Sequence, residues 1–206
     1  MFIRVIELSD EYNEVTWRIV PKATPVVIKH CSKCGRKMEF YCSEKFRLNG
    51  NNTKFDIWLI YKCSKCDSTW KLTIMQGVKP RDLPAGLLER FFNNDAELAR
   101  KYAFDRSLLK GSECELNYAN VGYTIEGFDP ADMPLNSTAP LLVRLKSAYA
   151  FDLKLSVFLA DVLGISISGV KRLAERGMLS ASPGCDIMKY RIRADIDILL
   201  QPECWL

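Results

Sequence analysis

Two near copies of one short segment decide how this chain folds: HCSKCG at residues 30–35 and KCSKCD at residues 62–67. Each holds two cysteines separated by two residues, so one tight turn can direct both sulfurs at the same point. The residue after the second cysteine of such a turn favours a left-handed backbone. Gly35 adopts that conformation freely, and Asp67 tolerates it better than most residues do. The sequence therefore predicts two turns that face a shared site.

Four thiolates from two such turns form a tetrahedral set of sulfur ligands, which suits Zn²⁺. We predict that Cys31, Cys34, Cys63 and Cys66 bind one zinc ion. Because four cysteines leave no open coordination position, the predicted zinc is structural. Two alternatives stay open. The same ligands bind iron in a rubredoxin-like site, and the two pairs are also candidate redox-active dithiols, although neither lies at a predicted strand-to-helix junction.

The other four cysteines are scattered, at positions 42, 114, 185 and 204, and each is expected to be a small buried apolar residue. A disulfide framework is not expected, because cytosolic thiols stay reduced. His30, the single histidine, adjoins Cys31 and is a weaker candidate ligand. The roles of His30 and Cys42 stay open at this point.

The 28 residues between the cysteine pairs have the pattern of a β-sheet. We predict strands over 38–42, 44–48, 54–61 and 69–75, with a turn at 49–52. This layout resembles a zinc ribbon, in which a small sheet is built around two cysteine turns. The strand aromatics Phe55, Trp58, Tyr61 and Trp70 could stack on bases, but we expect them to fill a core.

Composition indicates a soluble, cytoplasmic globular protein. Of the 206 residues, 48% are hydrophobic and 26% are charged. No apolar run reaches the roughly 18 residues of a membrane span. Acidic residues within positions 1–10 interrupt the apolar stretch that a signal peptide would need. We therefore expect no membrane partner, and no small-molecule substrate is evident from the sequence.

Charge divides the chain into three sections. Residues 1–80 carry 14 Lys and Arg against 8 Asp and Glu, residues 81–140 carry 6 against 10, and residues 141–206 carry 9 against 7. We predict a zinc-ribbon-like β domain at 1–80, an acidic helical section with a linker at 81–140, and a third unit at 141–206. The basic end sections are candidates for contact with nucleic acid.

The middle section has a helical pattern over residues 82–111, with Asp95 as a helix cap and Gly111 ending a third short helix. A strand is predicted at 121–126 and a linker at 127–140. We find no nucleophile–base pair, phosphate-binding loop, open metal site or paired carboxylates for acid–base chemistry. The sequence therefore predicts a protein that is not an enzyme.

The third section predicts a strand at 141–147, a helix ended by Gly164, a second helix capped by Ser166 and ended by Gly177, and a strand at 189–200. This order resembles the α-L RNA-binding domain shared by a ribosomal small-subunit protein, pseudouridine synthases and tyrosyl-tRNA synthetases. Residues that match or nearly match are Lys154, Leu155, Ser156, Ser166, Lys171, Arg172 and Gly177, and the pair Tyr190 and Arg191 resembles the family's later strand.

The resemblance implies a non-enzymatic protein that binds structured RNA, with phosphate contacts from Lys154, Lys171, Arg172 and Arg176. Ser168, Arg172 and Arg176 recur every four residues and so would form one stripe along a helix. The alternative is a zinc-stabilised adaptor that binds another protein.

Taken whole, we predict an α+β protein: an N-terminal zinc-ribbon-like sheet, a helical middle, and a C-terminal α-L-like helix-turn-helix with strands. Its Cys-x-x-Cys, Trp-containing strands, second Cys-x-x-Cys and acidic helical middle resemble an uncharacterised bacterial family, a domain of unknown function. That resemblance implies no assigned activity.

Overall fold

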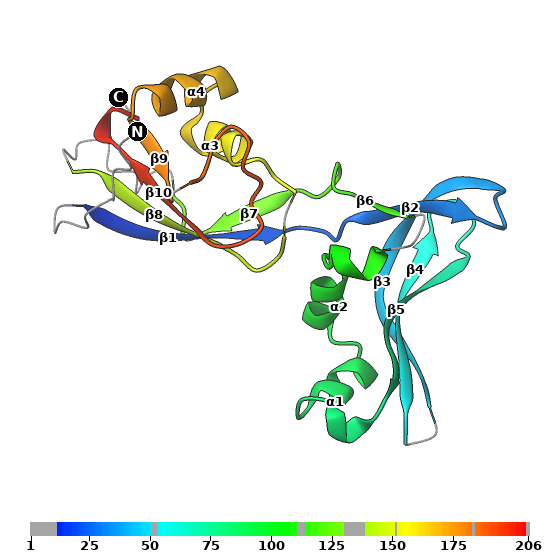
Figure 1. Cartoon of the computed structure of the whole chain (residues 1–206). Coiled ribbons are helices and arrows are strands. Elements are labelled where there is room, and N and C mark those ends of the chain that lie inside the picture. The colour runs from blue at the N-terminus through cyan, green and yellow to red at the C-terminus, as the bar shows by residue number, and fades with distance from the viewer. Residues whose placement is uncertain are drawn as a thin grey trace. The chain divides into compact units, whose positions relative to one another are not determined.

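The computed structural model describes residues 12–50, 53–110, 114–129, 139–150, 152–182 and 184–204. By its internal contacts the chain divides into two compact units (Figure 1). Unit 1 combines Met1–Pro21 with Tyr123–Leu206, and unit 2 is Lys22–Gly122. Each unit has one five-stranded sheet and helices, so the protein is α+β, as predicted. The three sections predicted at 1–80, 81–140 and 141–206 rest on the distribution of charge along the sequence. The two units rest on contacts in space, so their bounds differ from those of the sections.

The sheet of unit 2 has antiparallel strands in the order β5-β4-β3-β2-β6. Their bounds are β2 Val26–Cys31, β3 Arg36–Gly50, β4 Phe55–Cys63, β5 Thr69–Val78 and β6 Glu115–Asn117. The strands predicted at 54–61 and 69–75 correspond to β4 and β5. Residues 51–52 of the predicted turn lie outside the described residues.

The two strands predicted at 38–42 and 44–48 form one continuous strand, β3. A β-bulge explains the difference, because the register with β4 shifts between Cys42 and Phe46. Glu44, inside the bulge, has a left-handed backbone with φ of 54°. A bulge reverses the alternation of side chains without ending the strand, so the sequence pattern breaks where the strand does not.

Two helices of unit 2, α1 (Leu87–Phe92) and α2 (Ala96–Ala103), pack against β3. Asp95 caps α2 as predicted: its side chain accepts a hydrogen bond from the Leu98 backbone N–H at 2.8 Å. The third helix is only a 3₁₀ turn, Arg106–Leu109, and Gly111 lies outside the described residues. A further 3₁₀ turn spans Pro80–Asp82.

The core of unit 2 lies between these helices and one face of the sheet. Alternate residues of β4, from Phe55 to Cys63, are buried there with Phe91 of α1. Tyr61 is among them, and Trp70 packs on its ring at a centroid distance of 5.4 Å. The expectation that strand aromatics fill the core therefore holds for three of the four residues. It is wrong for Trp58, which lies at an alternate position of β4 and outside this core.

The sheet of unit 1 has the order β7-β1-β8-β10-β9. Its strands are β1 Asn13–Pro21, β7 Tyr123–Glu126, β8 Leu141–Ser147, β9 Leu179–Ala181 and β10 Ile196–Leu200. β1 and β8 are parallel, whereas the other pairs are antiparallel. The strand predicted at 189–200 is confined to β10. A turn occupies its first residues, where the Tyr190 N–H donates to the Asp186 carbonyl.

Unit 1 has two helices, α3 (Leu155–Leu163) and α4 (Ile167–Glu175). The end of α3 and the start of α4 lie where the sequence predicted them. Gly164 ends α3 with a left-handed φ of 64°. Ser166 caps α4 by accepting a hydrogen bond from the Gly169 N–H at 3.1 Å. Of the linker predicted at 127–140, residues 130–138 lie outside the described residues. Within the described part of the chain, every helix is too short or too polar to cross a membrane.

Candidate metal centre

The four predicted ligands lie at one edge of the unit 2 sheet. Cys31 is the last residue of β2 and Cys63 the last of β4, whereas Cys34 and Cys66 lie in the turns that follow these strands. Because β2 and β4 flank β3 and both run antiparallel to it, they end at the same edge. Sheet topology therefore brings the two turns together.

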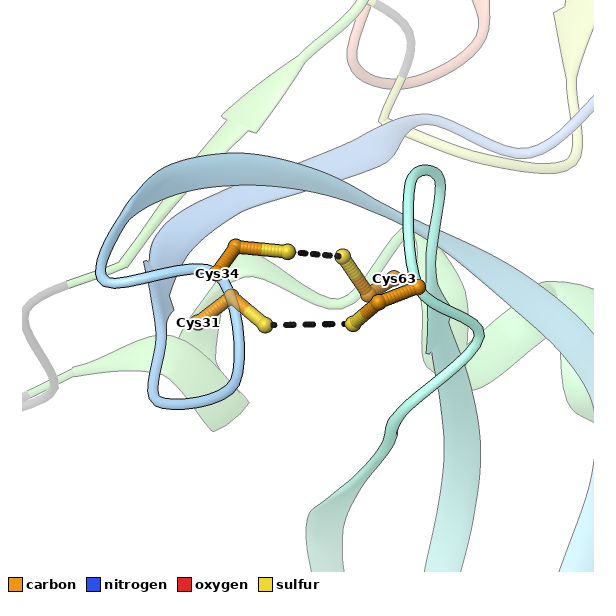
Figure 2. A group of neighbouring side chains, drawn as sticks. Cys31, Cys34 and Cys63 are labelled. Carbon is orange, nitrogen blue, oxygen red and sulfur yellow. Dashed lines mark hydrogen bonds between the residues drawn. The ribbon is translucent and has the colours of Figure 1, made fainter.

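The sulfur atoms of the two turns face one another (Figure 2). Cys31 Sγ lies 3.6 Å from Cys66 Sγ, and Cys34 Sγ lies 3.9 Å from Cys63 Sγ. All four sulfurs lie within 4.8 Å of one another. A zinc–sulfur bond of about 2.3 Å gives a tetrahedron with an edge of about 3.8 Å. All four residues are free cysteines, and the four could hold a metal ion.

The backbone of the two turns follows the prediction. Gly35 and Asp67 have left-handed backbones, with φ of 67° and 55°. The Gly35 N–H donates to the Cys31 carbonyl at 2.9 Å, and the Asp67 N–H donates to the Cys63 carbonyl at 3.0 Å. Each left-handed residue thus closes its turn with the equivalent hydrogen bond.

The side of the site that faces the core is shielded from solvent. Cys31 is 2% exposed and Cys63 is 1% exposed, whereas Cys34 and Cys66 are half-buried. All four contribute to the hydrophobic core of unit 2 or pack against it. Burial raises the pKa of the Cys34 thiol to about 12. An uncharged thiol is therefore favoured there until a cation compensates the lost hydration.

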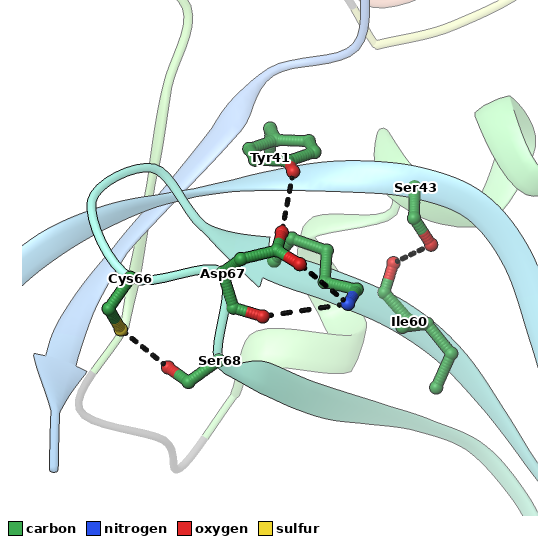
Figure 3. A network of polar contacts seen from close by, with 7 residues as sticks. Tyr41, Ser43, Ile60, Cys66, Asp67 and Ser68 are labelled. Atoms are coloured by element: carbon green, nitrogen blue, oxygen red, sulfur yellow. Dashed lines mark hydrogen bonds and ion pairs between the residues drawn. The ribbon is translucent and has the colours of Figure 1, made fainter. Parts of the chain in front are cut away.

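Sequence reasoning missed one residue of the site, Ser68. Its hydroxyl oxygen lies 3.3 Å from Cys31 Sγ. It also lies 3.1 Å from Cys66 Sγ (Figure 3). Hydrogen bonding to this hydroxyl is the main cause that lowers the pKa of Cys31, to about 6, and that of Cys66. A hydroxyl two residues after the last cysteine is the only signal that the sequence offered.

Asp67 anchors the second turn to the sheet (Figure 3). Its carboxylate accepts hydrogen bonds from the Tyr41 hydroxyl at 2.9 Å and from Lys62 Nζ at 3.1 Å. These contacts, led by that with Lys62, lower the pKa of Asp67. The contact with Asp67 raises the pKa of Tyr41. The turn is therefore held by β3 and β4 as well as by its own backbone.

The two open candidates, His30 and Cys42, lie outside the cysteine group in the described residues. His30 is exposed and lies opposite Lys37 in the strand register. Cys42 Sγ accepts a hydrogen bond from the Glu44 N–H at 3.4 Å, and burial raises its pKa to about 11. Cys42 thus behaves as the packed strand cysteine that the sequence led us to expect.

The residues predicted to contact RNA all lie in unit 1 and are exposed: Lys154, Lys171, Arg172 and Arg176. Lys154 is the N-cap of α3 and forms a β-bridge with Arg191. Lys171 forms an ion pair of 3.6 Å with Glu175. Arg172 and Arg176, at the end of α4, are one helical turn apart.

The fold and the cysteine site define an α+β protein with a candidate four-sulfur metal centre. The chain belongs to the family described as Protein of unknown function (DUF1062), which matches residues 48–184. The match includes Cys63 and Cys66 and begins after Cys31 and Cys34. No curated protein and no solved structure matches the chain.

Proposed function

We propose that this protein is a non-enzymatic zinc-binding protein whose zinc has a structural role. The proposal is carried by one observation: four sulfurs from two distant turns lie within 4.8 Å of one another, and two of the distances between the turns, 3.6 and 3.9 Å, are close to the edge of a tetrahedral ligand set. A four-sulfur site leaves no coordination position for a substrate or water, so it favours stabilisation over catalysis. Zinc would join the β2–β3 turn to the β4–β5 turn and so contribute directly to the folding of unit 2.

Elemental analysis of the purified protein tests this proposal. We expect about one zinc per chain, lost in a Cys31→Ser/Cys63→Ser double variant that is also poorly folded. Cys42→Ser is the matched control, because Cys42 is a half-buried cysteine of the same sheet that lies outside the group. If the analysis finds about one iron per chain and no zinc, the rubredoxin-like alternative is correct. Metal-free protein that stays folded in a chelator would overturn the proposal.

We further propose that the exposed face of α3 and α4 binds structured RNA through Lys154, Lys171, Arg172 and Arg176. The supporting observation concerns Arg172 and Arg176. Both are exposed, and neither forms an ion pair within the described residues. Residues four apart are neighbours on a helix surface, so both guanidinium groups can contact the same phosphate backbone.

A low-salt gel shift with cellular RNA tests this part. Arg172→Glu/Arg176→Glu should weaken binding, and binding should fall steeply with salt. Arg144→Glu, an exposed cation of the same unit that lies on β8 and not on α3 or α4, is the control. If wild-type protein binds no RNA above background, RNA binding is refuted and the adaptor alternative gains.

The adaptor alternative has its own supporting observation. Val157 of α3 and Ile167 of α4 are large apolar residues that are 38% and 47% exposed. Apolar side chains on a helix pair suit a protein partner better than a phosphate backbone. Val157→Asp/Ile167→Asp should then abolish co-purification of a specific protein. RNA binding through the basic residues does not require these two apolar side chains.

A further inference from the structure

The unit 2 sheet has a second face that is chemically distinct from its core face. Along β4, residues 55, 57, 59, 61 and 63 are buried, whereas residues 56, 58, 60 and 62 are half-exposed. The helices α1 and α2 contribute their buried residues to the core on the first face. Trp58 and Ile60 do not belong to that core. We call the second face the open face.

Strand register shows which neighbours share the open face. Trp58 lies opposite Arg47 of β3 and Thr73 of β5, and Ile60 lies opposite Lys71 of β5. Near the metal end of the sheet, Lys62 lies opposite Tyr41 and Thr69. The open face is therefore defined by these side chains: Tyr41, Arg47, Trp58, Ile60, Lys62, Thr69, Lys71 and Thr73.

Trp58 is the centre of the open face and has a cation on two sides. Lys71 Nζ lies 5.2 Å from the centroid of its ring, a cation–π contact. Arg47, on the opposite neighbouring strand, is exposed. The half-exposed indole thus has its stacking surface next to two groups that can bind phosphate.

Charge favours an anionic partner for this unit. Residues 22–122 carry 18 Lys and Arg against 11 Asp and Glu, whereas the residues of unit 1 carry 11 against 14. The nearby carboxylates of Asp56 and Asp67 already accept hydrogen bonds, from the Gly77 N–H and from Tyr41 and Lys62. Glu39 lies on the same face, next to β2. Arg47 and Lys71 form no ion pair within the described residues.

We propose that the open face binds single-stranded nucleic acid, with a base stacked on Trp58 and the adjoining phosphates at Arg47 and Lys71. A base would take the place of Lys71 Nζ over the indole, and the ammonium group would move to a phosphate. A single strand fits because its bases can leave the stack, whereas a duplex hides their flat surfaces. This inference goes beyond the proposed function, because it uses another unit and another class of nucleic acid.

The experiment is fluorescence anisotropy of the zinc-loaded full chain with labelled oligouridine and oligodeoxythymidine. Trp58→Ala should weaken binding about tenfold, and Trp58→Phe should retain most of it. Arg47→Ala/Lys71→Ala should weaken binding and reduce the slope of log affinity against log salt by about 1.4. Zinc content and circular dichroism establish that each variant is folded.

Matched controls lie on the other side of the sheet. Phe92→Ala removes an aromatic that is 56% exposed, and Lys101→Ala/Lys110→Ala removes two exposed cations; neither should change binding. Arg172→Glu/Arg176→Glu should also leave single-strand binding intact. The result therefore distinguishes a failure of this inference from a failure of the proposal that α3 and α4 bind structured RNA.

Three results would overturn the inference. The first is the absence of single-strand binding by folded wild-type protein. The second is binding that neither Trp58→Ala nor Arg47→Ala/Lys71→Ala weakens. The third is equally tight binding of polyglutamate, which would show attraction to any acidic polymer without base stacking.

Discussion

The sulfur of Cys31 lies 3.6 Å from the sulfur of Cys66, although the two residues are 35 positions apart in the chain. Neither turn alone holds four sulfurs, and the pairing of β2 and β4 with β3 is what brings the turns together. A metal ion held by all four sulfurs would therefore link metal binding to the folding of this sheet.

Metal removal should loosen unit 2 and leave unit 1 unchanged. The cysteine group lies within Lys22–Gly122, and none of its members belongs to unit 1. We expect a strong chelator to speed amide hydrogen exchange in β2, β3, β4 and β5, with little change in β1, β8 and β10. Mass spectrometry of the exchanged peptides measures both. Unchanged exchange in unit 2 after proven loss of metal would contradict a structural role.

Ser68→Ala should weaken metal binding about tenfold without changing the number of ligands. The hydroxyl oxygen lies within hydrogen-bond distance of Cys31 Sγ and Cys66 Sγ, where it can stabilise thiolate charge. Competition with a colorimetric zinc chelator measures the affinity. Thr69→Ala, the next residue and an exposed one, is the control. Equal affinities for Ser68→Ala and wild type would show that the hydroxyl has no such role.

Gly35→Ala should destabilise the zinc-loaded protein by about 1 kcal/mol. The whole effect is expected from the backbone, because φ is +67° and no atom lies within 4 Å of the added Cβ. Denaturant unfolding measures it. Gly122→Ala is the matched control, since its added Cβ has one contact at 3.6 Å and no left-handed φ. A Gly35→Ala protein as stable as wild type would refute the predicted strain.

Asp95 should make unit 2 more stable above about pH 4 than near pH 2. The Arg90 guanidinium, with the Leu98 N–H, lowers the pKa of Asp95 to about 2. A lowered pKa means that the stabilisation is present above the unfolded pKa and is lost as pH falls through the folded one.

Asp95→Asn keeps a cap oxygen and removes the charge, so its deficit in stability should shrink as pH falls toward 2. Urea unfolding at several pH values measures the difference, with Glu89→Gln as the control for loss of an exposed carboxylate. A deficit that does not change with pH would exclude this account of Asp95.

Local features of the fold could be predicted from the sequence, because their causes are local. The left-handed turns at Gly35 and Asp67 and the caps at Asp95 and Ser166 depend on neighbouring residues only. The four cysteines were grouped correctly because repeated spacing signals a shared site.

Features that depend on distant pairing could not be predicted. The parallel pairing of β1 with β8 joins segments that more than a hundred residues separate, and no local pattern signals it. The bulge in β3 divides one strand into two apparent ones. Trp58 is a large aromatic residue of the kind that usually fills a core. Only its register with Arg47 and Thr73 places it on the open face. Zinc-ribbon and α-L layouts stay predictions.

The most direct test of the central claim is the visible absorption spectrum of the protein reconstituted with Co²⁺. The claim is that Cys31, Cys34, Cys63 and Cys66 bind one ion together. Tetrahedral coordination by four thiolates gives intense visible bands and sulfur-to-cobalt charge transfer at one equivalent, and we expect these bands to persist in Cys42→Ser and change in Cys34→Ser. Weak absorption typical of octahedral Co²⁺, or a spectrum that Cys34→Ser leaves unaltered, would contradict the claim.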